Sequence, residues 1–459
     1  MISMTNSNDR PPTSHDADRL KIPFWEAFSF WLKLGFVSFG GPAGQIAIMH
    51  RELVERRRWI SEGRFLHALN YCMVLPGPEA QQLATYIGWL MHRTAGGVVA
   101  GLLFILPSLL ILIALSWLYM AYGHTDWLTG IFNGIKPAVT AIVLHAAYRI
   151  GGRTLKNKWL WSIATASFIA IFIFNTPFPL IIAVSALAGW LGGHFAPTQF
   201  SMATAHGNGK HGDSPAVIDD HTPTPAHAQF RWVRLLSMLA IGLLLWAVPL
   251  TTLTYAHTWQ STLPQMAWFF SKAALLTFGG AYAVLPYVYQ GAVGHYGWLT
   301  APQMIDGLAL GETTPGPLIM VVTFVGFVGG YQHPALAANL HTSPLWAGVL
   351  AACVVTWFTF LPSFIFIFAG GPLIESTHRK LAYTAPLTAI TAAVVGVIVN
   401  LACFFAYHVI WPTGLAHPPS WVSLLIMAGA ALALFRYQIN VLPVILLCGA
   451  AGWLFSLVG

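Results

Sequence analysis

Two lysines lie at equivalent distances from a repeated glycine motif. Lys33 is six residues before the Phe-Gly-Gly motif at 39–41, and Lys272 is six residues before the same motif at 278–280. A lysine inside a membrane segment costs roughly 2.5–3.5 kcal/mol unless it finds a partner. Two such ammonium groups predict a shared site for a small dianion. The alternative is that both side chains snorkel to the interface.

Glycine and proline motifs interrupt the same apolar stretches. Pro-Gly-Pro motifs at 76–78 and 315–317 accompany the two Phe-Gly-Gly motifs. Irregular backbone at membrane depth needs shelter from protein or water, and half-helices that begin at a break direct free N–H groups toward an anion. The predicted substrate-binding residues are Lys33, Phe39, Gly40, Gly41, Pro42, Pro76, Gly77, Pro78, Gln81, Gln82, Lys272, Phe278, Gly279, Gly280, Thr313, Thr314, Pro315, Gly316 and Pro317.

Two acidic residues beside the Pro-Gly-Pro motifs are candidates for proton coupling. Glu79 follows the first motif and Glu312 precedes the second. A carboxylate in a low-dielectric environment can carry a proton during transport, but each could instead cap a helix or pair with a lysine. Thr313 and Thr314 offer hydroxyl donors either to an oxyanion or to the preceding turn. A further acid, Asp306, is predicted near the membrane interface.

An internal repeat relates the two sets of motifs. An offset of 239 residues carries Phe39 onto Phe278 and Trp59 onto Trp298 without a gap. The two Pro-Gly-Pro motifs keep the same offset, and a Leu-Pro-Ser motif at 106–108 recurs after an insertion. Gene duplication explains a match of this length.

Composition places these motifs in a membrane. Hydrophobic residues make up 56% of the 459 residues and charged residues 8%, against roughly 25% charged in soluble domains. Apolar runs long enough for a helical crossing, about 20 residues, recur along the chain. A β-barrel would show alternating segments of about ten residues. The chain is therefore predicted to be an all-α polytopic membrane protein of the bacterial inner membrane.

Charge gives the relative orientation of the two repeats. Residues 50–64 include five arginines, whereas the equivalent residues 289–303 include no Lys, Arg, Asp or Glu. Lys and Arg are retained on the cytoplasmic side, so the two loops are expected on opposite sides. We predict two inverted-topology homologous repeats with broken or re-entrant helices, as nine full crossings plus four broken segments.

The same pattern sets the domain boundaries. An odd crossing between the repeats is what inversion requires. We expect a cytoplasmic N-terminal tail at 1–21, the first repeat at 22–193, a cytoplasmic linker at 194–232, an extra transmembrane helix at 233–256 and the second, inverted repeat at 257–459.

No metal or other cofactor is expected. The linker histidines have irregular spacing among Gly, Pro, Asp and Thr, which favours a flexible linker over a metal site. These are His206, His211, His221 and His227. The four cysteines lie in apolar segments without close pairing, so disulfides are not expected either.

Other functional classes are disfavoured. The net charge of +7 resides in clusters beside apolar spans and not on a soluble basic face, so nucleic-acid binding is not expected. The chain has neither an HExxH motif nor a nucleotide-binding Gly-x-x-x-x-Gly-Lys loop, which argues against an enzyme and a primary pump. The expected partners are the lipid bilayer and an oxyanion; the oligomeric state stays open, with a homodimer as one candidate.

In combination, the motifs resemble those of the chromate ion transporter family in its long, bidomain form. Segments 36–42, 75–82 and 312–317 carry the resemblance, together with 278–280 and 392–396. It implies a secondary transporter that exports chromate from the cytoplasm, driven by the proton-motive force, and so confers chromate resistance. Chromate and sulfate share shape and charge, so a sulfate or related oxyanion permease is the alternative.

Overall fold

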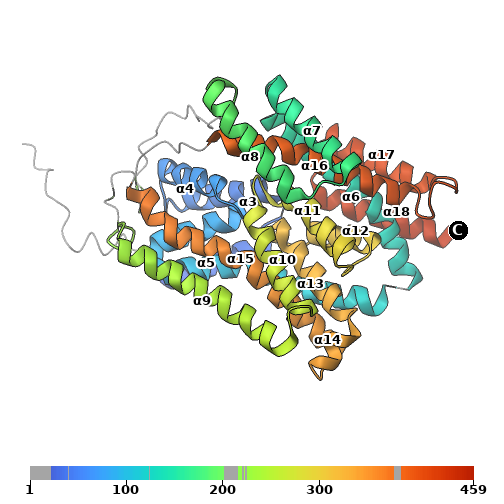
Figure 1. Cartoon of the computed structure of the whole chain (residues 1–459), viewed down its shortest axis with the longest axis horizontal. Coiled ribbons are helices and arrows are strands. Elements are labelled where there is room, and N and C mark those ends of the chain that lie inside the picture. The colour runs from blue at the N-terminus through green and yellow to red at the C-terminus, as the bar shows by residue number, and fades with distance from the viewer. Residues whose placement is uncertain are drawn as a thin grey trace, which may run out of the picture.

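The computed structural model describes residues 22–39, 41–123, 125–200, 216–219, 222, 225–376 and 384–458. Within these residues the regular structure is helical, and one parallel β-bridge joins Ile60 to Ile218. Figure 1 shows an elongated stack of helices that cross at varied angles. The predicted all-α class is confirmed.

The first repeat contains helices that end at its glycine and proline motifs. They are α2 (Phe24–Val37), α3 (Gly41–His50) with a π-helical continuation (Arg51–Arg56), α4 (Glu62–Val74), α5 (Glu79–Tyr122), α6 (Asp126–Thr154), α7 (Lys158–Phe174) and α8 (Phe178–Phe195). The backbone of α5 is non-helical at His92 and Arg93, so α5 comprises a short half-helix followed by a long helix.

The second repeat contains the same succession of helices. They are α10 (Thr262–Leu276), α11 (Ala281–Tyr289) with a π-helical continuation (Gln290–His295), α12 (Ala301–Thr313), a 3-10 turn (Leu318–Met320) leading into α13 (Val321–Tyr331), α14 (Pro334–Asn339), α15 (Pro344–Ser376), α16 (Thr384–Ile410), α17 (Trp421–Phe435) and α18 (Val441–Val458). Helix α9 (Trp232–His257) lies between the repeats and covers the segment predicted as an extra helix.

The helices pack as two bundles to which both repeats contribute. In the first, the six-helix bundle, α6 packs against α16, α17 and α18, and α16 packs against α7 and α8. In the second, the broken-helix bundle, α5 packs against α2, α13 and α15, and α15 packs against α9 and α10. Figure 1 shows the six-helix bundle at the upper right and the broken-helix bundle at the lower left, with α11 and α12 between them.

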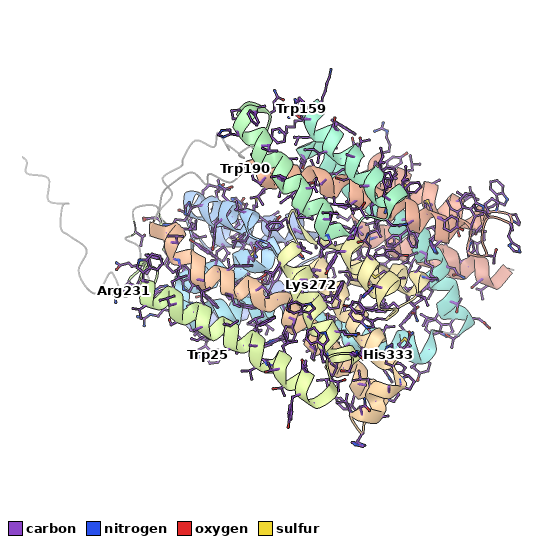
Figure 2. The ribbon with its side chains drawn as sticks, in the orientation of Figure 1. Trp25, Trp159, Trp190, Arg231, Lys272 and His333 are labelled. Atoms are coloured by element: carbon purple, nitrogen blue, oxygen red, sulfur yellow. The ribbon has the colours of Figure 1, made fainter. Side chains whose placement is uncertain are left out.

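The length and surface of the helices suit a bilayer. Among the described residues, six helices are long and apolar enough to cross a membrane, and α7, α17 and α18 are shorter apolar helices. Large apolar side chains such as Trp25, Trp159 and Trp190 project from the periphery (Figure 2) and are at least 61% exposed, a surface that lipid tolerates and water does not. The protein is a multi-pass membrane protein, and the nine-crossing topology stays a prediction.

Part of the linker packs against the first repeat, which corrects the expectation of a flexible linker for that part. The N–H groups of Val217 and Ile218 donate to the carbonyls of Arg58 and Trp59, both at 3.0 Å. The Ile218 side chain is buried in the core of the first repeat. These contacts give residues 217–218 a fixed, strand-like course beside the arginine-rich loop.

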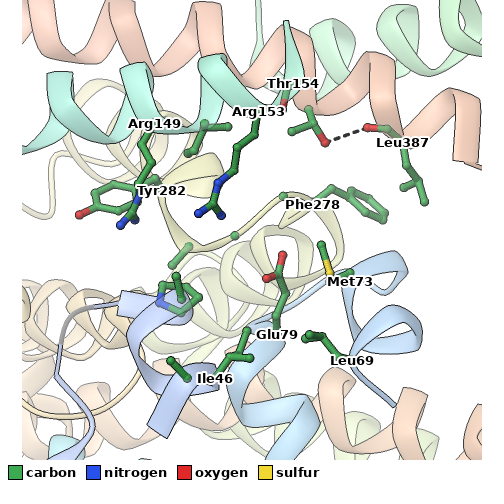
Figure 3. A pocket seen from close by; sticks show the side chains of 18 of the residues that line it. Ile46, Leu69, Met73, Glu79, Arg149, Arg153, Thr154, Phe278, Tyr282 and Leu387 are labelled. Carbon is green, nitrogen blue, oxygen red and sulfur yellow. Dashed lines mark hydrogen bonds between the residues drawn. The ribbon is translucent and has the colours of Figure 1, made fainter. Parts of the chain in front are cut away.

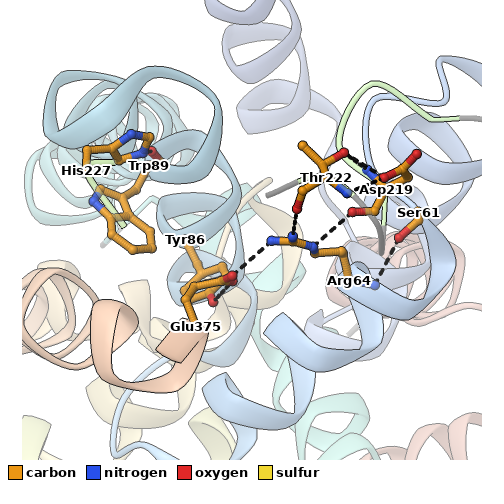
Figure 4. A network of polar contacts seen from close by, with 8 residues as sticks. All are labelled: Ser61, Arg64, Tyr86, Trp89, Asp219, Thr222, His227 and Glu375. Carbon is orange, nitrogen blue, oxygen red and sulfur yellow. Dashed lines mark hydrogen bonds and ion pairs between the residues drawn. The ribbon is translucent and has the colours of Figure 1, made fainter. Parts of the chain in front are cut away.

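An arginine of the first repeat fastens this linker to the second repeat. Arg64 donates to the backbone carbonyls of Asp219 at 3.1 Å and Thr222 at 2.6 Å, and its guanidinium pairs with Glu375 of α15 at 2.9 Å (Figure 4). Farther along, a ring nitrogen of His227 lies 2.9 Å from the Trp89 carbonyl. His206, His211 and His221 lie outside the described residues.

Candidate functional site

The four broken segments meet in a single crossing. The N–H of Gly77 donates to the carbonyl of Thr277 at 2.8 Å, and the N–H of Gly316 donates to the carbonyl of Ser38 at 2.8 Å. Each bond joins the Pro-Gly-Pro motif of one repeat to the residue before the Phe-Gly-Gly motif of the other. The two bonds are related by the 239-residue offset, so the repeats meet through an approximate two-fold relation.

Glycine is required at the centre of this crossing. Gly77 has φ +125° and Gly316 has φ +102°, a backbone region that residues with a side chain rarely adopt. A Cβ on Gly77 would lie 2.5 Å from the Oγ of Ser363, and one on Gly316 would collide with the Oγ of Ser108. Ser108 belongs to the repeated Leu-Pro-Ser motif, and Ser363 to its second copy. Each repeat thus places its serine against the glycine of the other.

Buried glutamines support the crossing from its sides. The Nε2 of Gln45 donates to the Gly316 carbonyl at 2.6 Å, and the Nε2 of Gln82 donates to the Pro76 carbonyl at 2.8 Å. Gln81 instead donates to the hydroxyl of Thr85 on its own helix at 3.0 Å. Of the two predicted glutamines, only Gln82 therefore holds the irregular backbone of the motifs.

A cavity of about 1090 Å³, here called the inner cavity, lies beside the crossing. Its walls come from α3, α4, the start of α5, the end of α6 and the starts of α11 and α16. Five predicted residues line it: Pro42, Glu79, Phe278, Gly279 and Gly280. Helix α11 begins on this wall after Gly280 and has no side-chain cap. The N–H of Ala283 donates to the Gly280 carbonyl at 3.0 Å. The first N–H groups of the helix, at Ala281 and Tyr282, can offer an anion both hydrogen bonds and the positive end of the helix dipole.

Two arginines of α6 enter the inner cavity. Figure 3 shows Arg149 and Arg153 directed from α6 toward Glu79, Tyr282 and the loop at Phe278. In the described part of the chain, neither guanidinium has an ion-pair partner within 4.0 Å. Planar guanidinium groups bind the oxygens of an oxyanion in pairs, so these two side chains are available to such a ligand.

The two predicted proton-coupling acids occupy different positions. Glu79 lines the inner cavity, and Arg153 is near enough to act on it electrostatically. Glu312 accepts a hydrogen bond from the hydroxyl of Tyr282, whose side chain lines the cavity, and Arg149 acts on Glu312 in the same way. Each acid thus has one arginine as an electrostatic neighbour without a direct ion pair.

Lys33 and Lys272 lie outside the inner cavity. Lys33 is exposed on α2, and Lys272 of α10 places its ammonium over the ring of Trp268, 5.7 Å from the centroid (Figure 2). Neither belongs to the cavity wall. The inner cavity therefore does not bring the two ammonium groups together, and whether they snorkel to the interface stays a prediction. The cations that the structure brings together at the breaks are Arg149 and Arg153.

The remaining predicted residues divide between the crossing and local structure. The hydroxyls of Thr313 and Thr314 donate to the preceding turn, at 2.9 Å each. Phe39 is exposed beside the crossing, and Gly40 lies outside the described residues. The residues Gly41, Pro76, Gly77, Pro78, Pro315, Gly316 and Pro317 form the turns of the crossing itself.

Asp306 is buried inside the protein, and its predicted place near the membrane interface stays a prediction. The residue is 3% exposed. Its Oδ2 accepts a hydrogen bond from Tyr119 at 2.9 Å and pairs with Lys136 at 3.6 Å. Lys136 also lines a second cavity of about 430 Å³, here called the outer pocket, bounded by α6, α12, α16, α17 and α18.

The two cavities show that the repeats run in opposite directions. The end of α6, at Arg153, and the start of α16, at Leu387, line the inner cavity. The start of α6, at Lys136, and the end of α16, at His408, line the outer pocket. Helices α6 and α16 occupy equivalent places in the two repeats and pack against each other. Their antiparallel course is the inversion predicted from the charges.

Arg149 and Arg153 belong to one of the basic clusters beside apolar spans, a loop with Lys156 and Lys158 that the sequence marks only for topology. The structure extends α6 to Thr154, so both arginines are helical. Their spacing of four residues places them on one helix face. That spacing was the signal that could have identified them as a pair.

Comparison with known proteins agrees with the repeat structure. The model of the chromate transporter family matches residues 25–190 and 264–453, one segment in each repeat. The chain is 33% identical to the chromate transport protein of Pseudomonas aeruginosa over 99% of both chains. It is 30% identical to the chromate transport protein of Cupriavidus metallidurans, over 82% of this chain and 81% of that protein.

A third relative, the probable chromate transport protein of Synechococcus elongatus, is 31% identical over 80% of this chain and 81% of its own. No solved structure matches the chain. The similarity covers the Phe-Gly-Gly and Pro-Gly-Pro motifs of both repeats as well as the arginine-bearing end of α6. The chain therefore belongs to the chromate transporter family.

Proposed function

We propose that this protein is a secondary transporter that exports chromate from the cytoplasm across the inner membrane and thereby confers chromate resistance. One observation carries the proposal: Arg149 and Arg153, both without an ion-pair partner among the described residues, share the inner cavity with the free N-terminus of α11. A tetrahedral dianion has acceptor oxygens on all sides, which suits two guanidinium groups and a helix N-terminus together. The relatives named for chromate transport support the choice of oxyanion.

The direction of transport follows from charge. Arg51 and Lys156 also line the inner cavity, and basic residues are retained on the cytoplasmic side, so the cavity takes its substrate from the cytoplasm. The membrane potential is worth about 2.3 kcal/mol per elementary charge per 100 mV. A dianion that leaves a negative interior carries two charges, so its free energy falls by twice this amount. The membrane-potential component of the proton-motive force alone therefore favours export.

Proton coupling is assigned to Glu79 and Glu312. The two charges of chromate match those of Arg149 and Arg153, which leaves Glu79 as a negative charge beside the bound anion. A proton on Glu79 would neutralise it. Glu312 is hydrogen-bonded to Tyr282, whose side chain lines the cavity. In this proposal Glu312 exchanges a proton with the cavity through Tyr282.

A sulfate or related oxyanion permease is the alternative function. Arg149, Arg153 and the α11 N-terminus provide hydrogen-bond donors and positive charge, and these serve chromate and sulfate alike. Their shared shape means that selectivity must come from small differences in size and in the cost of dehydration.

The test is radiolabelled chromate flux into inverted membrane vesicles. We expect accumulation that requires energy, disappears with an uncoupler and is reduced little by excess unlabelled sulfate. Strong competition by sulfate would instead identify a general oxyanion permease. Accumulation that appears only after the gradient is reversed would contradict export.

A further inference from the structure

Helix α6 carries a third cation in its first half. Lys136 lies thirteen residues before Arg149, about 20 Å along the helix axis. Its side chain is 24% exposed and faces the outer pocket. Most of the other described lining residues of that pocket are apolar, and none is acidic; its polar lining residues are Asn133, His408, Ser420, Ser423 and Ser456.

The partner of Lys136 is an incompletely satisfied buried carboxylate. Both the hydroxyl of Tyr119 and the ammonium of Lys136 reach the Oδ2 of Asp306. The Oδ1 of Asp306 is buried and has no hydrogen-bond partner among the described residues. A buried carboxylate oxygen without a donor is costly. An ionisable group of this kind inside a membrane protein is a candidate for a functional role.

These three residues link the two bundles at the outer end of the molecule. Lys136 belongs to the six-helix bundle through α6. Tyr119 is near the end of α5 in the broken-helix bundle, and Asp306 is on α12, which packs against both α6 and α5. The outer pocket lies between α12 and four helices of the six-helix bundle, α6, α16, α17 and α18. Movement of α12 away from α6 at this end would widen the pocket and would have to break the pair between Lys136 and Asp306.

We propose that Lys136, Asp306 and Tyr119 form a proton-controlled outer gate, and that Lys136 is an oxyanion subsite reached from outside. A proton from external water binds Asp306 and neutralises it. The ion pair then breaks, and the Lys136 ammonium becomes available to an oxygen of the oxyanion. When the oxyanion leaves, the proton returns to the external water and the pair forms again. This inference rests on the proposed function, because the subsite takes the same oxyanion.

Few other ionisable groups act on this gate. Within the described residues, the charged and titratable groups that face Asp306 are Lys136 and Tyr119. His408 of α16 lies across the outer pocket and has a ring nitrogen 3.0 Å from the Phe404 carbonyl. Helices α17 and α18 contribute serines to the pocket but no acid or base. A change with external pH at this end is therefore attributable to Asp306 once His408 is tested separately.

The test compares chromate exchange from the two faces of the full-length protein. Half-saturation for external chromate is measured in right-side-out vesicles, and for cytoplasmic chromate in inverted vesicles, each at pH 5.5, 6.5 and 7.5. The variants are Lys136→Gln, Asp306→Asn and His408→Gln. Glu26→Gln, an exposed acid on α2, serves as a matched control. Chromate itself takes up a proton in this pH range, equally for every variant, so differences between variants report the protein.

We expect Lys136→Gln to raise the chromate concentration at half-saturation about tenfold at the outer face. The same concentration at the cytoplasmic face should stay unchanged. At the outer face, the wild-type half-saturation concentration should depend on pH beyond the change caused by protonation of chromate itself. Asp306→Asn is expected to remove this extra dependence, whereas His408→Gln and Glu26→Gln should keep it. Tyr119→Phe is a milder variant for the case that Asp306→Asn does not fold. It should move the outer-face profile to higher pH, because the charged carboxylate loses a donor.

Three outcomes would overturn the outer gate: equal weakening at both faces in Lys136→Gln, an unchanged pH profile in Asp306→Asn or Tyr119→Phe, or a profile abolished by His408→Gln. Failure of the proposed function is distinguishable from all three, since it would show as an absence of chromate flux in the wild-type protein from either face.

Discussion

The two ends of α6 present the same kind of group in opposite states. At one end Arg149 and Arg153 face a cavity of about 1090 Å³ without ion-pair partners among the described residues. At the other end Lys136 borders a pocket of about 430 Å³ and is neutralised by Asp306. The unpaired arginines thus lie at the larger cavity and the paired lysine at the smaller pocket. We expect the transport cycle to alternate between this arrangement and its mirror image, a route that inverted repeats provide.

The two π-helical turns show what the repeats share and what they do not. In the first repeat, the N–H of Arg57 donates to Glu52 at 3.0 Å; in the second, the N–H of Tyr296 donates to Gly291 at 2.8 Å. Each bond joins residues five positions apart, and the 239-residue offset carries one bond onto the other. The backbones of the two π-helical turns therefore agree, but only the first turn carries arginines. Charge and not backbone shape distinguishes these two loops.

Removal of the free cations should have the largest effect. The double variant Arg149→Ala/Arg153→Ala should lose transport, because each charge-assisted contact is worth about 1.5–3 kcal/mol, or roughly 10–100-fold in affinity. Initial rates of chromate uptake into inverted vesicles provide the measurement. Arg231→Ala, an exposed arginine at the start of α9, is the control. Uptake at the wild-type rate in the double variant would remove the arginine site from the proposal.

Substitution at the crossing should have the next largest effect and should be the same in both repeats. Gly77→Ala and Gly316→Ala each place a Cβ in a disfavoured backbone region and against a serine, at a cost of about 1–3 kcal/mol. We expect a lower unfolding temperature in detergent and slower chromate flux. Gly429→Ala in α17, where a Cβ meets open space, should change neither. A large difference between Gly77→Ala and Gly316→Ala would show that the two halves of the crossing are not equivalent.

Neutralising the inner acids should alter coupling more than rate. In Glu79→Gln, the pH gradient should lose its influence on flux, while flux driven by the membrane potential persists. Glu312→Gln should show the same change more weakly, because its carboxylate reaches the cavity only through Tyr282. Flux is measured with the pH gradient and the potential imposed separately. An unchanged response to the pH gradient in both variants would make these acids structural.

Removal of the two lysines should have the smallest effect. Lys33→Ala and Lys272→Ala should change half-saturation by chromate by less than about threefold, since side chains outside the cavity contribute little to binding. Half-saturation of uptake into inverted vesicles measures this. A tenfold or greater loss in either variant would restore the lysine pair that the sequence predicts.

The features that sequence analysis predicts are those with local causes. Gly41, Gly77, Gly280 and Gly316 have positive φ values at the breaks between helices, and the duplication repeats those signals at a constant offset. The breaks, the repeats and the helical class therefore follow from short stretches of chain. The inversion follows as well, because the rule for Lys and Arg depends only on loops.

The parts that were missed depend on contacts between distant segments. Arg149 becomes a site residue only because α6 ends beside the start of α11 in the other repeat. Asp306 is buried because Tyr119 and Lys136 reach it from two other helices. The linker is ordered at Ile218 because the core of the first repeat accepts that side chain. The four-residue spacing of Arg149 and Arg153 is the one local signal of these contacts, and it does not say which distant segment they face.

The reciprocal bonds of Gly77 with Thr277 and of Gly316 with Ser38 also constrain how such a protein arose. Neither repeat supplies an acceptor for the amide of its own central turn. An ancestor of half this length would have had a dangling amide in its core and would have needed a second copy, inserted upside down, to complete it. In one polypeptide, α9 is the odd helix between the repeats that permits the inverted orientation of the second.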